Sequence, residues 1–250
     1  MSMSRIDLNS DVGEGCSHDA ALMPLITSAN IACGIHAGDV DTMREAVNLA
    51  RYVGVGIGAH PSLNDRANFG RKEIKVTPRE VHLYVLTQTK LLQIIARQCG
   101  AKVGHVKPHG ALYNMAARDP ELAEAVAGAV YDVDPGLVLF GLAGSCLISA
   151  GEARGLRVAS EVFADRTYQA NGSLTPRSQP GAMITDEDEA VAHVWRMISE
   201  GVIRATDGTE VPVKADTVCV HGDGVTPVNF ALKLRAKLNT EGFRLQATGM

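Results

Sequence analysis

The fold class is decided by the stretch Ala29-Asn-Ile-Ala-Cys33-Gly-Ile-His36-Ala-Gly-Asp39 together with the residues that follow it, Val40–Tyr52. An apolar run is typical of a β-strand, a polar turn with glycines closes it, and a helical pattern begins near Asp39. The same order of strand, polar turn and helix recurs from end to end of the chain. Repeated β-α units predict a parallel sheet, because right-handed crossovers lay each helix over the sheet.

Seven such units are expected, with no linker and no low-complexity segment between them. We expect strands at Ile6–Ser10, Ala29–Cys33, Gly54–Ala59, Val103–Lys107, Leu137–Leu142, Arg157–Phe163 and Thr217–Val220. We expect helices at Asp19–Ile26, Val40–Tyr52, Thr77 to about Gly100, Asp119 to about Tyr131, Leu147–Ala153, from Thr185 onward, and Pro227–Leu238. A long loop, Pro61–Val76, precedes the clearest helix start, where Thr77, Pro78 and Glu80 combine an N-cap, a first-turn proline and a capping-box glutamate.

The chain length of 250 residues fits one barrel or one large α/β domain, and a hydrophobic fraction of 46% suffices for a full core. We therefore expect a single-domain (β/α) barrel of seven strands that spans residues 1–250. An open, doubly wound α/β sheet is the alternative, because the sequence does not decide whether the sheet closes.

Charge and cysteine content argue against several classes of protein. The net charge is −4, from 24 basic and 28 acidic residues, and no basic stripe is present, so neither nucleic acid nor a membrane surface is expected as a partner. Five scattered cysteines without a CxxC pair argue against a disulfide framework and a cysteine-rich zinc site. The first residues form no apolar signal, and no run approaches about 18 apolar residues. We expect a soluble, cytoplasmic protein.

Polar clusters close nearly all of the apolar runs, at residues 9–14, 30–39, 59–65, 105–110, 141–144, 161–166, 171–177 and 221–224. Ionisable groups at many strand ends favour an enzyme site, because catalytic groups gather at the carboxyl ends of parallel strands. Ordinary polar loops are the alternative, although loops need only Gly, Asn, Ser and Pro. Period two also places polar residues on one strand face, in the sets Asp7, Asn9 and Asp11; His105, Lys107 and His109; Glu161, Phe163 and Asp165; and His221 and Asp223.

The catalytic candidates are Asp11, His36, His60, Lys107 and His109. His36 could be a general base or a metal ligand, and Asp39 could orient it or simply cap the next helix. Lys107 suits a phosphate or carboxylate ligand, although a buried lysine paired with an acid is the alternative. His109 can move protons near neutral pH.

The substrate-binding candidates are Asn9, Glu14, Asp39, Asp165, Arg166, His221 and Asp223. Asp165 and Arg166 could clamp a substrate carboxylate or simply form a structural pair. Cys33 and Cys146 could be nucleophiles, but small buried cysteines are the more common outcome. The chain has no P-loop, GxSxG or HExxH motif, and the glycines at 54, 56 and 58 are followed by His-Pro, not by the helix of a dinucleotide-binding loop.

Several long motifs, in order, resemble the LamB/YcsF family over nearly the whole chain. They are residues 7–15, 28–39, 58–62, 69–71, 105–114, 161–166 and 220–223. The sequence departs from the family pattern at Cys16-Ser17-His18, at Asn68 where Gly is expected, and at Asn171 where Asp is expected. None of these departures touches the catalytic candidates.

The resemblance implies a seven-stranded β/α barrel similar to glycoside hydrolase and polysaccharide deacetylase folds. It also implies the role of the first component of 5-oxoprolinase, which opens 5-oxoproline to L-glutamate with ATP and subunits B and C. On that basis we expect ATP as a cofactor, at a site that the sequence does not place and that partner subunits could share. In the mechanism, Asp11, His36 and His60 would handle protons, Lys107 and His109 would hold phosphate, and Arg166 would hold the substrate carboxylate.

Two other functions stay open at this point, as does self-association into a homo-oligomer. One is a metal-dependent deacetylase or amidohydrolase for a small or carbohydrate substrate, with Asp11, His36 and His60 as ligands of a divalent metal. The lack of a closely spaced HxxxH pair weighs against it. The other is a non-catalytic subunit that senses a small carboxylate, which would need fewer titratable groups than this chain carries.

Overall fold

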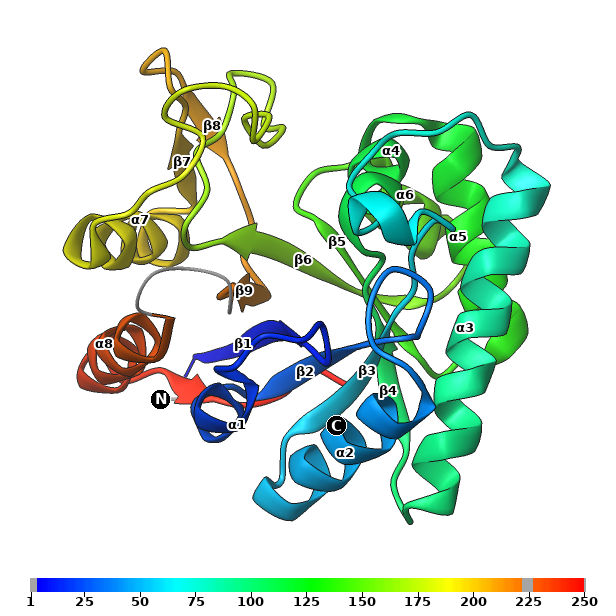
Figure 1. The fold of residues 1–250 in the computed structure, drawn as a ribbon. Coiled ribbons are helices and arrows are strands. Elements are labelled where there is room, and N and C mark those ends of the chain that lie inside the picture. The colour runs from blue at the N-terminus through cyan, green and yellow to red at the C-terminus, as the bar shows by residue number, and fades with distance from the viewer. Residues whose placement is uncertain (1–3, 222–226, 250) are drawn as a thin grey trace.

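The computed structural model of the chain describes residues 4–221 and 227–249. Seven parallel strands form the centre of the fold, and helices surround them (Figure 1). These strands are β1 (Arg5–Val12), β2 (Ser28–Ala32), β3 (Gly56–His60), β4 (Val103–Val106), β5 (Val138–Leu142), β6 (Arg157–Phe163) and β9 (Thr217–Cys219).

The sheet closes on itself because the first and last of these strands pair. The order runs β1-β2-β3-β4-β5-β6-β9, and β9 pairs in parallel with both β6 and β1. In the closing pair, Asp7 lies opposite Thr217 and Asn9 opposite Cys219. The prediction of a seven-stranded β/α barrel is therefore confirmed, and the open doubly wound sheet is excluded.

The longer helices are α2 (Val40–Val53), α3 (Pro78–Gln98), α4 (Gly110–Arg118), α5 (Pro120–Val133), α6 (Cys146–Ala153), α7 (Glu187–Ser199) and α8 (Pro227–Thr240). Four of the longer helices, α2, α3, α5 and α7, begin at a side chain that caps them. At α3 the Thr77 hydroxyl accepts from the Glu80 amide, and the Glu80 carboxylate accepts from Thr77, so the predicted capping box is present. The Asp39 carboxylate caps α2 by accepting from the Thr42 amide.

The two faces of the barrel strands bury different kinds of side chain. The outward residues, such as Leu8, Ile31 and Val218, join the large apolar core beneath the helices. Inside the barrel, Val138, Phe140 and Ala159 form a small apolar cluster of their own. The rest of the interior is largely polar, which is unusual because branched apolar residues normally fill a barrel. A polar interior of this kind positions functional groups.

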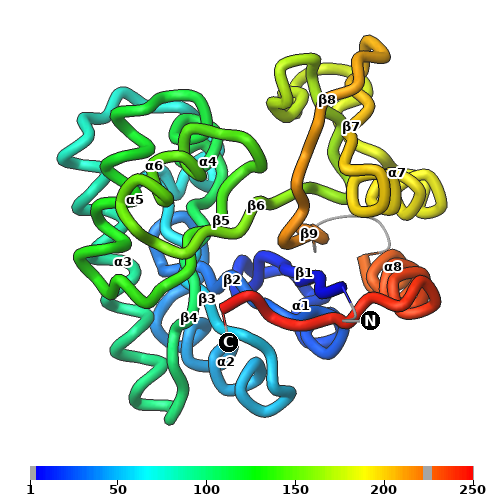
Figure 2. The backbone as a smooth tube through the Cα atoms, turned by 180° about the vertical axis from the view of Figure 1, so that it is seen from behind, coloured from blue at the N-terminus to red at the C-terminus, as the bar shows by residue number. Residues whose placement is uncertain are grey.

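Some elements carry no clear signal in the sequence. Helix α4 starts directly after His109, in a stretch for which we predicted no helix. The first predicted helix is shorter, since α1 (Asp19–Leu22) passes into a 3₁₀ turn, Met23–Leu25. Between β6 and β9 the chain leaves the barrel, forms α7 and pairs the short strands β7 (Val202–Arg204) and β8 (Glu210–Pro212) beside it (Figure 2). Strands of three residues are too short for periodicity to reveal.

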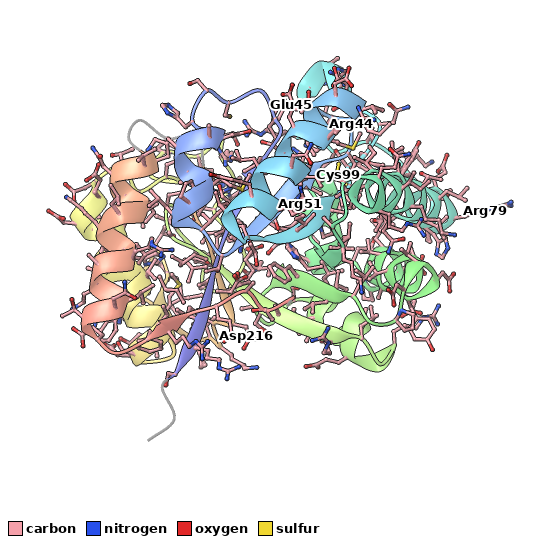
Figure 3. All side chains as sticks on the ribbon, turned by 90° about the horizontal axis from the view of Figure 1, so that it is seen from below. Arg44, Glu45, Arg51, Arg79, Cys99 and Asp216 are labelled. Atoms are coloured by element: carbon pink, nitrogen blue, oxygen red, sulfur yellow. The ribbon has the colours of Figure 1, made fainter. Side chains whose placement is uncertain are left out.

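Charged side chains cover the outer layer. Figure 3 shows Arg79 of α3 projecting away from the molecule, and Arg44, Glu45 and Arg51 on α2.

A short final strand, β10 (Arg244–Leu245), pairs with the start of β1. Among the described residues, no helix combines the length and the apolar character needed to cross a membrane.

Candidate active site

Polar side chains from six strands meet at the carboxyl-terminal mouth of the barrel. They are Asp11 and Glu14 from β1 and its loop, His36 after β2, His60 on β3, Lys107 and His109 after β4, Glu161 on β6, and Cys219 and His221 at the end of β9. The structure thus brings together Asp11, His36, His60 and Lys107, which are far apart in the sequence. Their convergence was the central expectation from the sequence.

Lys107 is at the centre of this group and is buried. Its Nζ lies 3.0 Å from Asp11 Oδ1, 2.9 Å from Glu161 Oε1, 3.2 Å from Asn9 Oδ1 and 3.1 Å from Cys219 Sγ. Burial would lower the pKa of the ammonium group, but the nearby carboxylates of Asp11 and Glu161 raise it well above its usual value. An ammonium has three N–H groups, and the chain already offers four acceptors for them.

Asp11 lies between a cation and an imidazole. Its Oδ1 accepts from Lys107 and from Asn30 Nδ2, which is 2.8 Å away, and its Oδ2 lies 3.2 Å from His60 Nε2. Burial would raise the pKa of Asp11, but His60 and Lys107 hold it well below its ordinary value. Asp11 is therefore an ionised carboxylate at the mouth of the barrel.

Glu14 forms a second, tighter group with three histidines. Its Oε1 lies 3.0 Å from His36 Nε2, 3.1 Å from His109 Nδ1 and 3.7 Å from His60 Nε2. His36 stacks on His109 with ring centroids 3.9 Å apart. Burial lowers the pKa of His36 to about 4 and also lowers the pKa of His109, so both rings are neutral at neutral pH. The four side chains are close enough for a single metal ion to touch one atom of each.

Backbone carbonyls fix the tautomers of two of these rings. His60 Nδ1 lies 2.7 Å from the Lys107 carbonyl, and His109 Nε2 lies 2.9 Å from the Phe69 carbonyl. A carbonyl oxygen only accepts, so each of these nitrogens carries a proton and donates it. The other nitrogens face carboxylates: His109 Nδ1 lies beside Glu14, and His60 Nε2 lies between Asp11 and Glu14. Burial would lower the pKa of His60, but the Asp11 carboxylate raises it above its usual value.

A polar network below these groups supports them. Asn30 Nδ2 donates to Asn9 Oδ1, and Asn30 Oδ1 lies 2.8 Å from His105 Nε2. His105 stacks on Phe140, with ring centroids 4.3 Å apart. Near the amino end of the barrel, Asp7 is buried, and burial raises its pKa to about 6.

A third ionisable pair lies on the side formed by β6 and β9. His221 Nδ1 lies 2.8 Å from Asp165 Oδ1, and the His221 ring stacks on Phe163. Burial would raise the pKa of Asp165, but His221 lowers it below its usual value. The Asp165 carboxylate therefore fixes the His221 tautomer with the proton on Nδ1. Asp223, which we also selected from the sequence, lies outside the described residues.

Two of the selected residues do not join the cluster. Asp39 is exposed and caps α2, as the alternative interpretation had it. Arg166 is buried, and its guanidinium donates to the backbone carbonyls of Thr175 and Ala182. Asp165 and Arg166 do not act together as the suggested clamp. Asp165 pairs with His221, and Arg166 donates to backbone carbonyls later in the chain.

Several residues of the site were missed as candidates. Glu161 was placed on an inward strand face but not selected, and Cys219 and Asn30 carried no signal of their own. Phe69 was also missed: its ring contacts His36 and His109 edge-on, and its φ of 57° is the one positive value among the described non-glycine residues. Such strained backbone is often found at functional sites. In the same loop, Asn68 replaces the expected glycine and donates to Asp65 Oδ1 at 2.7 Å.

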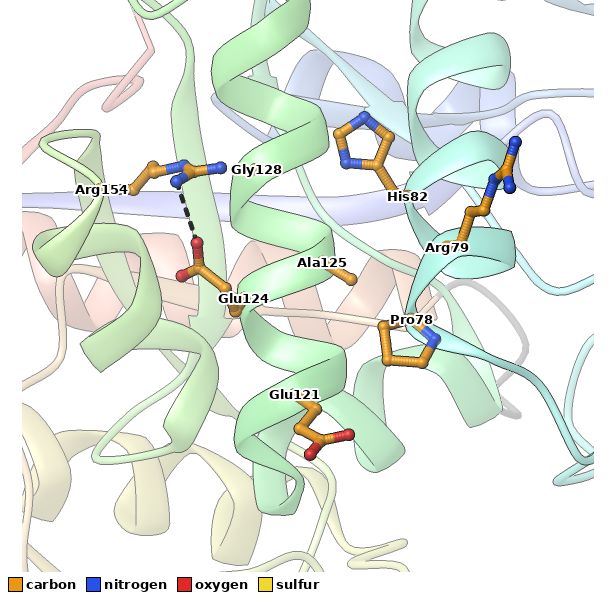
Figure 4. A pocket seen from close by; sticks show the side chains of 8 residues that line it. All are labelled: Pro78, Arg79, His82, Glu121, Glu124, Ala125, Gly128 and Arg154. Atoms are coloured by element: carbon orange, nitrogen blue, oxygen red, sulfur yellow. Dashed lines mark ion pairs between the residues drawn. The ribbon is translucent and has the colours of Figure 1, made fainter.

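A hollow on the helical layer outside the barrel does not share these features. It has a volume of about 300 Å³ and lies between α3 and α5 (Figure 4). Its lining includes Arg79, His82 and the Glu124–Arg154 ion pair, with N and O atoms 3.1 Å apart. It holds no group of acids and imidazoles comparable to that at the barrel mouth.

The fold and the site together define a β/α-barrel protein with an acid–imidazole centre at the carboxyl ends of its strands. More narrowly, the chain belongs to the LamB/YcsF family, whose model matches residues 6–250. It is 56% identical over 250 residues to a protein of Shouchella clausii that is named as a 5-oxoprolinase component, covering 98% of this chain and 99% of the relative.

Solved structures agree with this assignment. The lactam utilization protein from Thermus thermophilus is 43% identical, with a TM-score of 0.90 that covers 97% of this chain and 99% of that one. A deacetylase solved with substrate has a TM-score of 0.51 at 14% identity, covering 97% of this chain and 87% of the other. At that identity the likeness shows the fold alone, and it confirms the deacetylase-like barrel expected from the sequence.

Proposed function

We propose that this chain is the component of a 5-oxoprolinase that opens the lactam ring of 5-oxoproline to L-glutamate, in an ATP-coupled reaction with subunits B and C. The observation that carries the proposal is the similarity, over 98% of the chain, to a relative named as a 5-oxoprolinase component. The ionisable groups at the barrel mouth supply the acid–base chemistry that opening an amide requires.

Ring opening sets clear chemical demands on the site. A water oxygen bonds to the ring carbonyl carbon, the C–N bond breaks, and the ring nitrogen leaves with an added proton. The site therefore needs a group that takes a proton from water and a group that gives one to nitrogen. Catalysis also needs both groups fixed in place before the substrate arrives.

Asp11 and His221 match these two tasks. Asp11 is held ionised by His60 and Lys107 and can accept the proton of water. His221 has a ring nitrogen within 4.8 Å of a ligand atom of Asp11, and Asp165 holds its Nδ1–H; as an imidazolium it would give the proton on Nε2 to the leaving ring nitrogen. This assignment moves the acid–base role from His36 and His60 to His221, because His36 faces Glu14 and His60 lies between Glu14 and Asp11.

Lys107 has a different role in this scheme from the phosphate ligand that the sequence suggested. All its N–H groups have acceptors within the barrel, which leaves none for a phosphate. Its charge instead keeps Asp11 ionised at neutral pH. Arg166, whose guanidinium is used by backbone carbonyls, is likewise not assigned to the substrate.

ATP and the partner subunits complete the proposal. Transfer of the terminal phosphoryl group of ATP to the lactam oxygen would release ADP and make the ring carbon more electrophilic. Addition of water and cleavage of the C–N bond would then leave an acyl phosphate, which a second water hydrolyses to glutamate and inorganic phosphate. The sequence has no P-loop motif, which fits an ATP site on, or shared with, one of the two partner subunits. The substrate class is then a small carboxylate that passes between subunits of one complex.

The test is glutamate production from 5-oxoproline and ATP. The chain alone should give none, and the chain with subunits B and C from the same organism should give glutamate and ADP together. A complex in which Asp11→Asn replaces Asp11 should assemble but lose turnover. Assembly without any glutamate, under conditions where the Shouchella clausii complex is active, would overturn the proposal.

A second function is favoured by the histidine–glutamate group itself. Three imidazoles and a carboxylate are the ligands of metal-dependent hydrolases, so an ATP-independent deacetylase or amidohydrolase remains the alternative. It predicts acetate release from N-acetylated sugars or small amides by the chain alone. Glutamate formation that depends strictly on ATP would argue against it.

A further inference from the structure

We infer that Glu14, His36, His60 and His109 form a binding site for one divalent transition-metal ion of the zinc type. The ligand atoms are Glu14 Oε1, His36 Nε2, His60 Nε2 and His109 Nδ1, all within 4.8 Å of one another. Asp11, which the sequence suggested as a ligand, is replaced in this set by Glu14 and His109. Metal binding does not depend on the reaction, whereas the use of the ion in ring opening rests on the proposed function.

The fixed tautomers are the first argument. His60 Nδ1 and His109 Nε2 donate to backbone carbonyls, so the nitrogens left for a ligand, His60 Nε2 and His109 Nδ1, point at each other, 3.0 Å apart. A metal ion between them would take the place of the proton that one of these two nitrogens must otherwise hold. Metal-bound histidines typically donate their second N–H to a carbonyl or carboxylate in this way, which orients the ring for the ion.

The spacing is the second argument. A tetrahedral zinc ion with bonds of about 2.0–2.1 Å holds its ligand atoms about 3.3 Å apart. The distances from Glu14 Oε1 to the three imidazole nitrogens are 3.0, 3.1 and 3.7 Å, which bracket this value. Imidazole nitrogens suit zinc, copper, iron and nickel better than magnesium or calcium.

Charge is the third argument. Asp11, Glu14 and Glu161 bring three carboxylates into the barrel mouth, where Lys107 is the one lysine or arginine in ion-pair contact with them among the described residues. Buried charges are costly unless they are paired. A divalent cation on Glu14 would offset this excess, and a proton shared by His60 would do so only in part.

A rival site nearby fits less well. Asp11, Cys219 and His221 also lie within 4.8 Å of one another. However, the Lys107 ammonium is 3.0 Å from Asp11 Oδ1 and 3.1 Å from Cys219 Sγ, so a metal ion there would face a fixed positive charge. The ion is therefore expected at Glu14 and the histidines.

The test measures metal binding without reference to activity. The chain is stripped with a chelator and titrated by calorimetry with Zn²⁺ and separately with Co²⁺, as wild type and as Glu14→Gln and His109→Gln. His82→Gln is the control for a histidine outside the site, and Cys219→Ser is the control for the rival group. Circular dichroism shows whether each variant is folded.

Wild type should bind one equivalent, and the Kd should weaken about 100-fold or more in Glu14→Gln and His109→Gln, given that even outer-shell changes cost 10–100-fold. His82→Gln and Cys219→Ser should keep the wild-type Kd. Should the two site variants fail to fold, imidazole NMR of the wild type decides: Zn²⁺ should shift the ring signals of three of the eight histidines.

Three results would overturn the inference: no stoichiometric binding, ring signals that do not shift, or binding that is lost in Cys219→Ser but kept in Glu14→Gln. None of them bears on 5-oxoprolinase activity. Conversely, one tightly bound ion in a complex that makes no glutamate would leave this site standing and remove the proposed function.

Discussion

The Lys107 ammonium nitrogen lies 2.9 Å from Glu161 Oε1, and both side chains are inside the barrel with almost no exposure to solvent. Two charges in such a place stabilise the fold only as a pair, because each alone would be buried without compensation. Asp11 extends the pair outward to the barrel mouth. The Lys107 ammonium, which lowers the pKa of the proposed catalytic carboxylate of Asp11, is therefore also part of the buried interior of the barrel.

Lys107→Met should destabilise the chain and also abolish turnover in the assembled complex. Removing one partner of a buried ion pair costs about 3–5 kcal/mol of unfolding free energy, measured by urea titration. Lys107→Met with Glu161→Gln should recover part of that loss, because the second change removes the stranded charge. The double variant should still be inactive, since Asp11 has lost its cation. Near-normal glutamate production by a folded Lys107→Met complex would remove Lys107 from the mechanism.

Asp39→Ala should lower the Tm by about 2–4 °C and leave the KM for 5-oxoproline unchanged. The Asp39 carboxylate accepts from the Thr42 amide and hydroxyl at the start of α2 and is otherwise exposed. Asp39→Ser keeps an N-cap and should restore the Tm. If Asp39 bound substrate, both variants would raise the KM to a similar extent, whatever their effect on Tm.

The strands and most helices could be predicted because their signals are local. The strand Arg157–Phe163 was predicted with the bounds that it has, and the capping box at Thr77 marked the start of α3. Closure was predicted, but local signals left the open sheet as an alternative, because closure depends on Asp7 lying opposite Thr217, far away in the sequence. No local pattern encodes that pairing.

Site residues could be predicted from the sequence where they directly follow a strand. His60 and Lys107 follow apolar runs, and parallel strands bring such residues to one rim. The direction of a side chain in an irregular segment has no such rule, so Arg166 was expected at the substrate although it serves backbone carbonyls. The ligand group has no HxxxH spacing because Glu14, His36, His60 and His109 come from four different strand ends.

Gly58→Ala should destabilise the barrel by roughly 3 kcal/mol, at the upper end of typical overpacking costs. A Cβ at Gly58 would lie 2.0 Å from His105 Nε2, and the His105 ring is confined by Phe140 and Asn30. Gly58 thus makes room for a buried imidazole. Gly54→Ala is the matched control: it meets no atom within 4 Å but has a φ of 79°, so only backbone strain of about 1 kcal/mol applies.

If the cause is overlap, His105→Ala should relieve Gly58→Ala, so that the double variant is more stable than Gly58→Ala alone. Equal losses of unfolding free energy in Gly58→Ala and Gly54→Ala would show that the His105 ring does not set the cost.

Asp7→Asn should change how stability depends on pH. Burial raises the pKa of Asp7 from 3.8 to about 6 in the folded chain, although hydroxyls of Thr27, Ser28 and Thr217 hydrogen-bond to its carboxylate. Between these two values the folded chain keeps a proton that the unfolded chain has lost. The contribution of Asp7 to the unfolding free energy is therefore fully present below about pH 4. It falls by about 1.4 kcal/mol per pH unit until about pH 6.

The Asn side chain does not titrate, so the unfolding free energy of Asp7→Asn does not decrease in this way. The unfolding free energy of Asp7→Asn minus that of wild type should rise by about 3 kcal/mol between pH 4 and pH 6 and stay level above it. Urea titrations of both proteins at several pH values give this difference directly, and it cancels the titration of every other group. Curves that run parallel from pH 4 to pH 8 would mean that Asp7 is ionised in the folded barrel throughout that range, and that the three hydroxyls, not burial, set its pKa.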